Sequence, residues 1–235
     1  MPRLAIPHGP ADYDESFVDV MVSQYFEPTA WSRLRLASIA ELVQPQAGER
    51  LLDLGCAIGA QADFFSRFGC ETVGVDLEPK LVAKARQLFP DIEFHVADAV
   101  DLPFPDGSFE KVVAADLTEH VLDDTLDAMF AEVHRVLAPG GAVAIYTPNP
   151  GHVIERLKER NVLIEQNPLH IGLRDRHRLA AALGRAGLAV EHDGWAPSPW
   201  LKPLERLGSR WFELFRYRIC LRARKPAGAE LAAAA

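Results

Sequence analysis

Cysteine, long apolar runs and excess positive charge are all scarce in this chain of 235 residues. The three cysteines, Cys56, Cys70 and Cys220, have no paired or metal-binding spacing, which favours a reduced, cytoplasmic protein over a disulfide-bonded secreted one. No apolar run reaches the about 18 residues that a membrane-spanning helix needs, and no charged-then-apolar signal segment is visible. We therefore expect neither export nor a transmembrane segment.

The net charge of −8 disfavours a nucleic-acid partner, because binding a polyanion needs a broad surface of lysine and arginine. Positive charge gathers only near the C-terminus, where residues 200–215 place apolar side chains at helical spacing opposite arginines. Two interpretations of residues 200–215 stay open. The segment docks on a membrane surface or a lipidic substrate, or it packs on the sheet as the connection between the last two strands. The alternating strand that follows favours packing.

Composition and periodicity predict one α/β domain. With 49% hydrophobic and 25% charged residues, the chain is long enough for one ordinary domain and too short for two. Short apolar segments alternate with helical ones, which is typical of a parallel sheet covered on both faces. The expected strands are 50–54, 71–76, 92–97, 110–116, 141–147, 188–194 and 216–224. The expected helices are 13–25, 30–43, 59–68, 79–88, 121–138 and 175–187, with an irregular insertion at 148–172.

The most informative segment joins the first two expected strands. It reads Asp53-Leu54-Gly55-Cys56-Ala57-Ile58-Gly59, and Asp76 and Leu77 follow at the end of the second strand. Gly55 and Gly59 would let the backbone turn sharply and approach a ligand closely. A carboxylate at a strand end, such as Asp76, can accept two hydrogen bonds from a ribose diol. The segment therefore indicates a pocket for a nucleotide-type cofactor.

The loop is not a dinucleotide-binding loop. That loop needs G-x-G-x-x-G to hold a pyrophosphate, whereas Ala57 and Ala60 stand at two of the glycine positions. This spacing also disfavours an NAD-dependent oxidoreductase. The run Asp53-x-Gly55-x-Ala57-x-Gly59 instead resembles motif I of the class I S-adenosylmethionine-dependent methyltransferases, with Ala57 replacing the usual middle glycine. The elements from about residue 30 to 225 follow in the order of that family.

The resemblance implies a fold, a cofactor and a set of cofactor-binding residues. The fold would be a Rossmann-like, doubly wound, mostly parallel seven-stranded α/β sheet with helices on both faces. The cofactor would be S-adenosylmethionine, which leaves as S-adenosylhomocysteine. Asp53 would lie on the methionine side, Asp76 would hold the ribose and Asp98 would meet the adenine. The full expected set is Asp53, Gly55, Cys56, Ala57, Gly59, Asp76, Leu77, Asp98, Ala99, Asp116 and Leu117.

A second group of polar residues comes just after the fourth expected strand, where the transferred methyl should be near. Asp116, Glu119 and His120 can share one face of a turn, because positions i, i+3 and i+4 lie together on a helix. The group resembles the E-x-x-E-H segment of ubiquinone-biosynthesis O-methyltransferases and of small-RNA 3′-terminal 2′-O-methyltransferases. Those families bring a further histidine from beyond the fifth strand, where this chain has His170. The resemblance implies a site for Mg²⁺, Mn²⁺, Fe²⁺ or Zn²⁺ with the ligands Asp116, Glu119, His120 and His170.

A metal-free interpretation stays open beside the metal site. A Glu-His pair also follows the fourth strand in metal-free members of the superfamily. In that case His120 or His170 could act as a general base, because an imidazole with a pKa of about 6.5 takes up protons near neutral pH. His152 is expected to be a solvated loop residue. Three aromatic residues of the N-terminal segment suit either a lid over the cofactor or, as we favour, core packing: Tyr13, Phe17 and Tyr25.

These patterns predict a division of the chain and an activity. Residues 1–47 would form an N-terminal helical lid and 48–225 the methyltransferase domain, with an insertion at 148–172 and an aromatic and basic segment at 196–215. The Ala-rich tail 226–235 is expected to be disordered. The expected activity is O-methylation of a small-molecule hydroxyl. The alternatives are an RNA 2′-O-methyltransferase and a non-catalytic module that only binds S-adenosylmethionine. The acceptor and the oligomeric state stay open.

Overall fold

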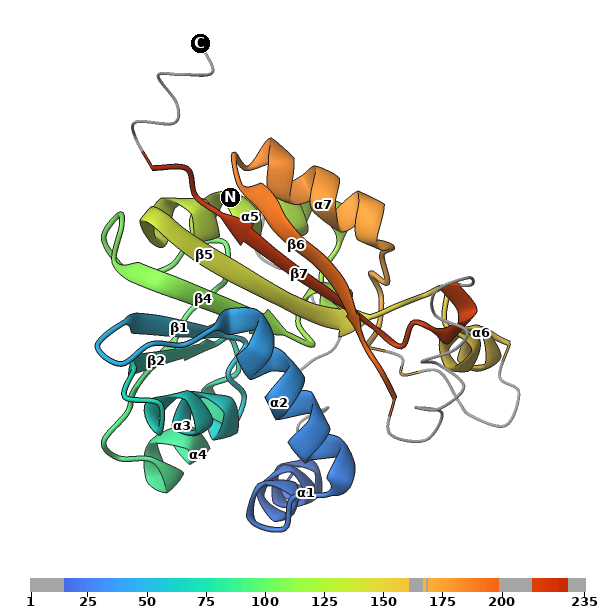
Figure 1. Ribbon diagram of the computed structural model, residues 1–235. Coiled ribbons are helices and arrows are strands. Elements are labelled where there is room, and N and C mark those ends of the chain that lie inside the picture. The colour runs from blue at the N-terminus through green and yellow to red at the C-terminus, as the bar shows by residue number, and fades with distance from the viewer. Residues whose placement is uncertain (1–14, 161–166, 168, 199–212, 228–235) are drawn as a thin grey trace.

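The computed structural model describes residues 15–160, 167, 169–198 and 213–227. Within them, seven strands form one sheet in the order β3-β2-β1-β4-β5-β7-β6 (Figure 1). The strands are β1 (Arg50–Leu54), β2 (Glu71–Asp76), β3 (Glu93–Val96), β4 (Phe109–Ala115), β5 (Leu137–Pro148), β6 (Ala189–Ala196) and β7 (Arg218–Arg224). The α-helices are α1 (Glu15–Phe26), α2 (Ala30–Val43), α3 (Ala60–Ser66), α4 (Pro79–Leu88), α5 (Asp123–Val136), α6 (Val153–Glu159) and α7 (Arg176–Arg185). Two short 3₁₀-helices are η1 (Thr118–His120) and η2 (Glu213–Phe215).

The sheet is mostly parallel, which confirms the predicted fold class. Strands β1 to β5 run in one direction, and β7 lies antiparallel between β5 and β6. The chain first builds outward from β1 to β3 and then returns to place β4 on the other side of β1. Ligands of open α/β sheets bind outside the carboxyl ends of the strands at such a reversal. The topology therefore points to the loops after β1 and β4.

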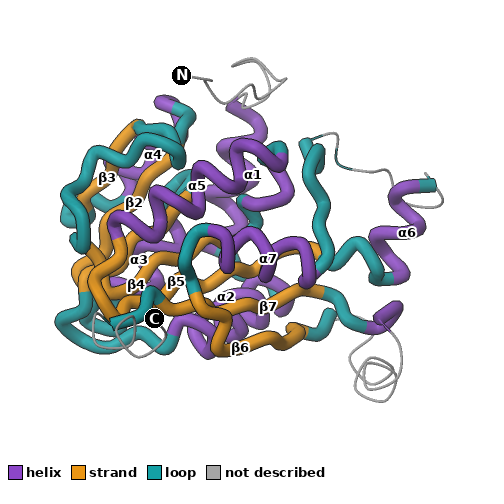
Figure 2. Tube along the Cα trace, turned by 90° about the horizontal axis from the view of Figure 1, so that it is seen from above, coloured by secondary structure: helices purple, strands orange, loops and turns teal. Residues whose placement is uncertain are grey.

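Helices cover both faces of the sheet (Figures 1 and 2). On one face, Met129 and Phe130 of α5 and Leu179 of α7 are fully buried in one core cluster with residues of the strands. On the other face, Ile39 of α2 and Phe65 of α3 are fully buried in a second cluster. Burying each such side chain contributes about 1.5–3 kcal/mol. The two apolar layers hold the carboxyl ends of β1, β2 and β4 in a fixed arrangement.

Local capping sets several helix ends close to their predicted positions. The Thr29 hydroxyl accepts a hydrogen bond from the backbone N–H of Ser32 at 3.1 Å and begins α2. Pro79 occupies the first turn of α4. The Asp175 carboxylate accepts a hydrogen bond from the N–H of Arg178 at 2.9 Å and begins α7. These signals are local in the sequence, which explains why the pattern alone could find them.

Two expectations about elements are wrong. The segment 148–172 is not irregular throughout, because α6 forms within it at Val153–Glu159. The helix expected at 121–138 is shorter at both ends and spans Asp123–Val136. η1 occupies Thr118–His120, the two residues after it are extended, and β5 already begins at Leu137. Most of residues 200–215 and of the tail 226–235 lie outside the described residues. None of the described helices is long and apolar enough to span a membrane.

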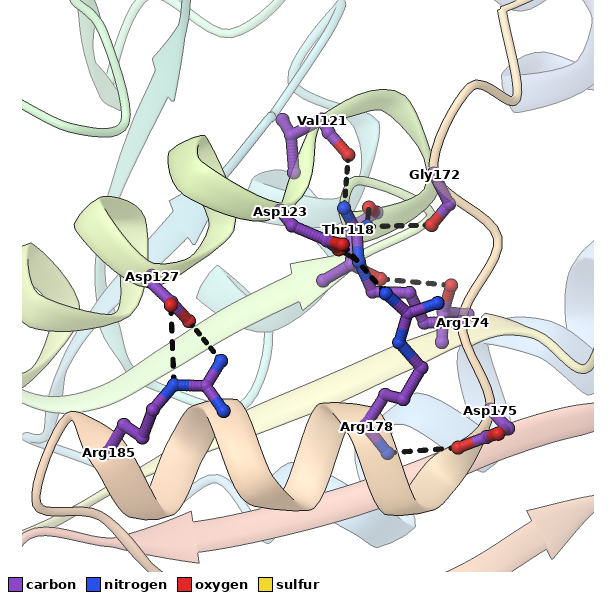
Figure 3. Close-up of polar contacts among 10 residues, drawn as sticks. Thr118, Val121, Asp123, Asp127, Gly172, Arg174, Asp175, Arg178 and Arg185 are labelled. Carbon is purple, nitrogen blue, oxygen red and sulfur yellow. Dashed lines mark hydrogen bonds and ion pairs between the residues drawn. The ribbon is translucent and has the colours of Figure 1, made fainter.

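The Arg174 side chain, just before α7, forms hydrogen bonds with the segment after β4 (Figure 3). Arg174 is 5% exposed. Its guanidinium donates hydrogen bonds to the backbone carbonyls of Thr118, Val121 and Gly172, each at 2.7 Å. Its Nε donates to Asp123 at 2.6 Å. The guanidinium thus donates the hydrogen bonds that these carbonyl groups would otherwise receive from water, since no helix or strand of the described residues provides a donor for them. It fixes the shape of η1, which carries Glu119 and His120.

Replacing Arg174 with methionine should lower the free energy of unfolding by about 3–5 kcal/mol, because it leaves buried carbonyls without donors. Arg178 provides a matched control, since it also pairs with Asp123, at 2.7 Å, but its side chain is 61% exposed. Arg178→Met should cost less than about 1 kcal/mol. Urea unfolding of the two variants measures both values, and equal losses would contradict the assigned role of Arg174.

Candidate active site

Two adjoining cavities lie at the carboxyl edge of the sheet. The β2 cavity has a volume of about 320 Å³ and the α2 cavity a volume of about 290 Å³. Met21, Gly55, Ala57 and Asp116 line both of them. The β2 cavity is also lined by Asp76, Leu77, Asp98, Ala99, Leu117, His120, Asn167 and Leu169, among others. The α2 cavity is also lined by Tyr25, Trp31, Arg35, Asp53, Cys56 and Gln61, among others.

The loop after β1 lines both cavities and packs closely against the side chains behind it. Gly59 has a φ of 81°, and a Cβ there would lie 2.6 Å from the ring of Phe94. Ala57 also has a positive φ, of 48°, although it carries a side chain. A non-glycine residue rarely adopts this conformation. The strain is offset by a 2.8 Å hydrogen bond from the Ala57 N–H to Asp76 Oδ2.

Asp76 and Asp98 lie where the β2 cavity meets the ends of β2 and β3. Asp76 accepts hydrogen bonds from the N–H groups of Ala57, at 2.8 Å, and Glu78, at 3.0 Å. Burial raises its pKa. Asp98 accepts one from the N–H of Val100 at 3.1 Å. Each carboxylate oxygen has two lone pairs, so both side chains can still accept hydrogen bonds from a ligand in the cavity.

Asp53 is almost completely buried at the wall of the α2 cavity. It is 1% exposed, and Gln61 Nε2 donates to its Oδ1 at 2.7 Å, while Oδ2 has no partner among the described residues. Burial raises the pKa of Asp53 to about 7. Nearby Cys56 is 4% exposed and is a packed residue of the turn. Asp53 therefore offers an unused carboxylate oxygen to a cationic ligand group.

Asp116 lies between two arginines that the sequence pattern did not connect to it. Arg35 Nε of α2 donates to Asp116 Oδ2 at 2.7 Å, and Arg218 Nη1 of β7 lies 3.1 Å from Oδ1. These positive charges hold the pKa of Asp116 below its usual range, despite burial. Asp116 has a φ of 54°, a strained backbone conformation. No local signal joins Asp116 to Arg35, since the two are 81 positions apart.

Glu119, His120 and His170 come together as expected, but Asp116 is not part of their group. One ligand atom from each of these three lies within 4.8 Å of the others. The imidazole rings of His120 and His170 meet edge to face at 5.2 Å. Thr147 Oγ1 donates to Glu119 Oε2 at 3.0 Å, and burial raises the pKa of Glu119 to about 8. The structure thus brings together three of the four proposed metal ligands.

The hydrogen bonds of the two histidines differ. His120 Nδ1 lies 3.0 Å from the carbonyl oxygen of Leu169. A carbonyl only accepts, so Nδ1 carries the proton and Nε2 keeps its lone pair when the ring is neutral. His170 Nδ1 is buried and has no partner among the described residues. Burial lowers the pKa of both histidines, that of His170 to about 4.

His152 is a buried helix cap, so the expectation of a solvated loop residue is wrong. It is 0% exposed, its Nδ1 accepts a hydrogen bond from the N–H of Ile154 at 3.2 Å, and its ring contacts Tyr217. The side chain begins α6, the helix that the sequence pattern also missed. Histidine is an uncommon N-cap, so the usual capping signal is absent.

The N-terminal helices form one wall of the α2 cavity. Met21 and Tyr25 of α1 and Trp31 of α2 line it. Tyr25 also contacts the ring of Phe89 and donates to Asp63 Oδ2 at 2.5 Å. Tyr25 therefore both packs against Phe89 and lines the α2 cavity. Tyr13 and the side chain of Phe17 lie outside the described residues.

The sheet order, the glycine loop and the strand-end carboxylates define a Rossmann-like protein with a nucleotide-type cofactor pocket. Residues 52–145 match a family model described as a methyltransferase domain. Residues 52–145 thus belong to the methyltransferase-domain family, and the sheet order and the glycine loop support the class I S-adenosylmethionine-dependent type.

Curated relatives agree with this family. Tocopherol O-methyltransferase of Arabidopsis thaliana is 35% identical over 121 residues, covering 48% of this chain and 34% of that protein. A "Probable S-adenosylmethionine-dependent methyltransferase" of Mycolicibacterium smegmatis is 30% identical over 165 residues, covering 70% and 62%. Sterol 24-C-methyltransferase ERG6 of Saccharomyces cerevisiae is 32% identical over 108 residues, covering 43% and 28%. The chain spans less than two thirds of the length of each.

Solved structures share the fold. A SAM-dependent methyltransferase from Archaeoglobus fulgidus has a TM-score of 0.70 at 17% identity, covering 90% of this chain and 100% of that chain. The [4+2]-cyclase SpnF has a TM-score of 0.66 at 21% identity, covering 86% and 84%. These likenesses concern the fold alone, and the second shows that the fold also carries other chemistry.

Proposed function

We propose that this protein transfers the methyl group of S-adenosylmethionine to a hydroxyl oxygen of a small molecule. The β2 cavity would take the adenosine, with Asp76 on the ribose and Asp98 near the adenine. The α2 cavity would take the methionine part, with Asp53 facing its ammonium group. The sulfonium would then lie where the two cavities meet, near Gly55 and Asp116.

His120 is the observation that carries the proposal for oxygen. It lines the β2 cavity beside Asp116, and Leu169 fixes its tautomer so that Nε2 can accept a proton. The methyl of a sulfonium is already activated, so the protein must align an acceptor and exclude water. A hydroxyl acceptor also has to lose its proton, and a positioned neutral imidazole takes it up. The relatives are named for both O- and C-methylation, and the positioned base supports oxygen as the acceptor atom.

The same group of side chains also fits a divalent cation. One carboxylate and two imidazoles, from Glu119, His120 and His170, form a donor set that suits Mn²⁺, Fe²⁺ or Zn²⁺. Such an ion lowers the pKa of a bound hydroxyl. Arg218 opposes it, since its positive charge acts on both Glu119 and His170. We therefore favour His120 as the base over a metal.

Calorimetric titration of S-adenosylhomocysteine into the purified protein tests the cofactor, with NAD as the control ligand. We expect micromolar binding of the first and none of the second. Elemental analysis of the same sample, before and after EDTA, should show less than stoichiometric metal and unchanged binding. Stoichiometric metal would move substrate activation to the ion, and absence of binding would refute the proposed function.

A companion assay distinguishes the alternatives. Methyl transfer from labelled S-adenosylmethionine to a panel of hydroxyl compounds should yield product, whereas a module that only binds the cofactor would yield none. Binding of short RNA at two salt concentrations should be negligible at both, given the net charge of −8. Tight, salt-dependent RNA binding would favour the RNA methyltransferase.

A further inference from the structure

Arg218 is a buried cation with unused hydrogen-bond donors. The residue is 8% exposed, at the start of β7. Its guanidinium lies over the rings of Tyr146, at 5.7 Å, and Tyr217, at 4.9 Å. Although Nη1 lies 3.1 Å from Asp116 Oδ1, neither Nε nor Nη1 makes a hydrogen bond with the described residues. Burying an ionised group without hydrogen bonds is costly, so these donors are available to an anion.

The charges around Arg218 do not balance. Asp116 faces two cations at once, Arg35 at 2.7 Å and Arg218 at 3.1 Å. These three side chains together hold one positive charge in excess, because a single carboxylate faces two guanidinium groups.

The excess charge lies at the edge of the sheet where the acceptor must approach. Strand β7 is antiparallel to β5, and Arg218 pairs with Pro148, the last residue of β5. The start of β7 thus lies beside the carboxyl end of β5, and the ion pair of Arg218 with Asp116 brings it close to the end of β4. Asp116 follows β4 directly, and His120 is the last residue of η1, the short helix that comes just after β4. The two arginines lie on different elements. Arg35 of α2 lines the α2 cavity together with Asp53, whereas Arg218 is the first residue of β7 in the sheet.

We propose that the methyl acceptor carries a carboxylate beside its hydroxyl and that Arg218 binds this carboxylate. The inference rests on the proposed function and adds the class of substrate. The carboxylate neutralises the excess charge and accepts hydrogen bonds from Nε and Nη1, while the hydroxyl is directed toward His120. Arginine is suited to this role, because its planar fork matches the geometry of a carboxylate.

Matched pairs of acids and amides test the proposal. The probes are protocatechuate, para-hydroxybenzoate and salicylate, each with its primary amide, titrated by calorimetry into the protein loaded with S-adenosylhomocysteine and EDTA. At least one acid should bind about 10-fold or more tightly than its amide. In Arg218→Met this preference should fall to about 1, and Arg218→Lys should keep part of it. Arg222→Met is the control on the same strand, and it should keep the full preference.

The outcomes separate this proposal from the proposed function. Binding of S-adenosylhomocysteine with wild-type affinity shows that each variant is folded and that the cofactor assignment stands. No preference for any acid, or a preference that persists in Arg218→Met, would overturn the carboxylate site alone. If Arg218→Met weakens the binding of S-adenosylhomocysteine instead, Arg218 serves the methionine carboxylate and the proposal also fails.

Discussion

Asp53→Asn is expected to weaken the binding of S-adenosylhomocysteine by about 10- to 100-fold and yet to stabilise the free protein at alkaline pH. The loss follows from removing a charged partner of the methionine ammonium group, worth about 1.5–3 kcal/mol. The gain follows from burial, which raises the pKa of Asp53 in the folded protein to about 7, from the ordinary value of 3.8.

The sign of the pH dependence is fixed by that pKa. Between about pH 4 and pH 7 the folded state binds a proton at Asp53 that the unfolded state releases, so the wild type loses stability as the pH rises. With about 1.36 kcal/mol for each pKa unit, the loss is on the order of 4 kcal/mol by pH 8. The amide in Asp53→Asn cannot ionise, so the advantage of the variant should be absent at pH 4 and largest at pH 8.

Urea unfolding at several pH values, together with calorimetric titration of the ligand, measures both effects. Asp91→Asn, at an exposed carboxylate, is the control and should change neither quantity. A difference in stability that does not depend on pH would contradict the raised pKa. Unchanged ligand affinity would remove Asp53 from the methionine site.

His120→Gln is expected to lower kcat by about 10²- to 10⁴-fold, the usual contribution of a positioned general base. The glutamine amide can still donate to the carbonyl of Leu169, but it cannot take up a proton. The variant should therefore keep its fold, and it should bind S-adenosylhomocysteine within about threefold of the wild type. Single-turnover methyl transfer to the best acceptor of the panel measures the effect.

His177→Gln is the matched control, since His177 is exposed on α7 and should leave kcat unchanged. Undiminished kcat in His120→Gln would exclude His120 as the base. An equal fall in both variants would point to a general loss of structure.

The elements that sequence reasoning predicted well are those whose signals lie within a few residues. The strand, glycine loop and carboxylate from Asp53 to Asp76 follow one another directly, so their spacing alone indicated the cofactor pocket. The helices expected at 79–88 and 175–187 begin at or next to their predicted starts for the same reason, because Pro79 and the Asp175 cap act within one turn. The element α6 was missed because its cap, His152, is not a usual capping residue.

The candidate site was predicted less completely, because its charges come from distant segments. Glu119, His120 and His170 do meet, but Asp116 is held by Arg35 and Arg218 and does not join them. Nothing in the local pattern distinguishes Arg218 from the other arginines near the C-terminus. Its role depends on the antiparallel pairing of β7 with β5, which places it next to Asp116.

The sequence by itself indicated the fold class, the methyltransferase domain and the glycine loop that lines both cavities, because backbone conformation, capping and hydrophobic periodicity act over short distances. Only the tertiary structure decided which ionised groups face one another, because the energy of a buried charge depends on every neighbour within a few ångströms, wherever that neighbour lies in the chain. That dependence raises the pKa of Asp53 and Glu119, lowers that of Asp116, and leaves Arg218 with donors for an anion.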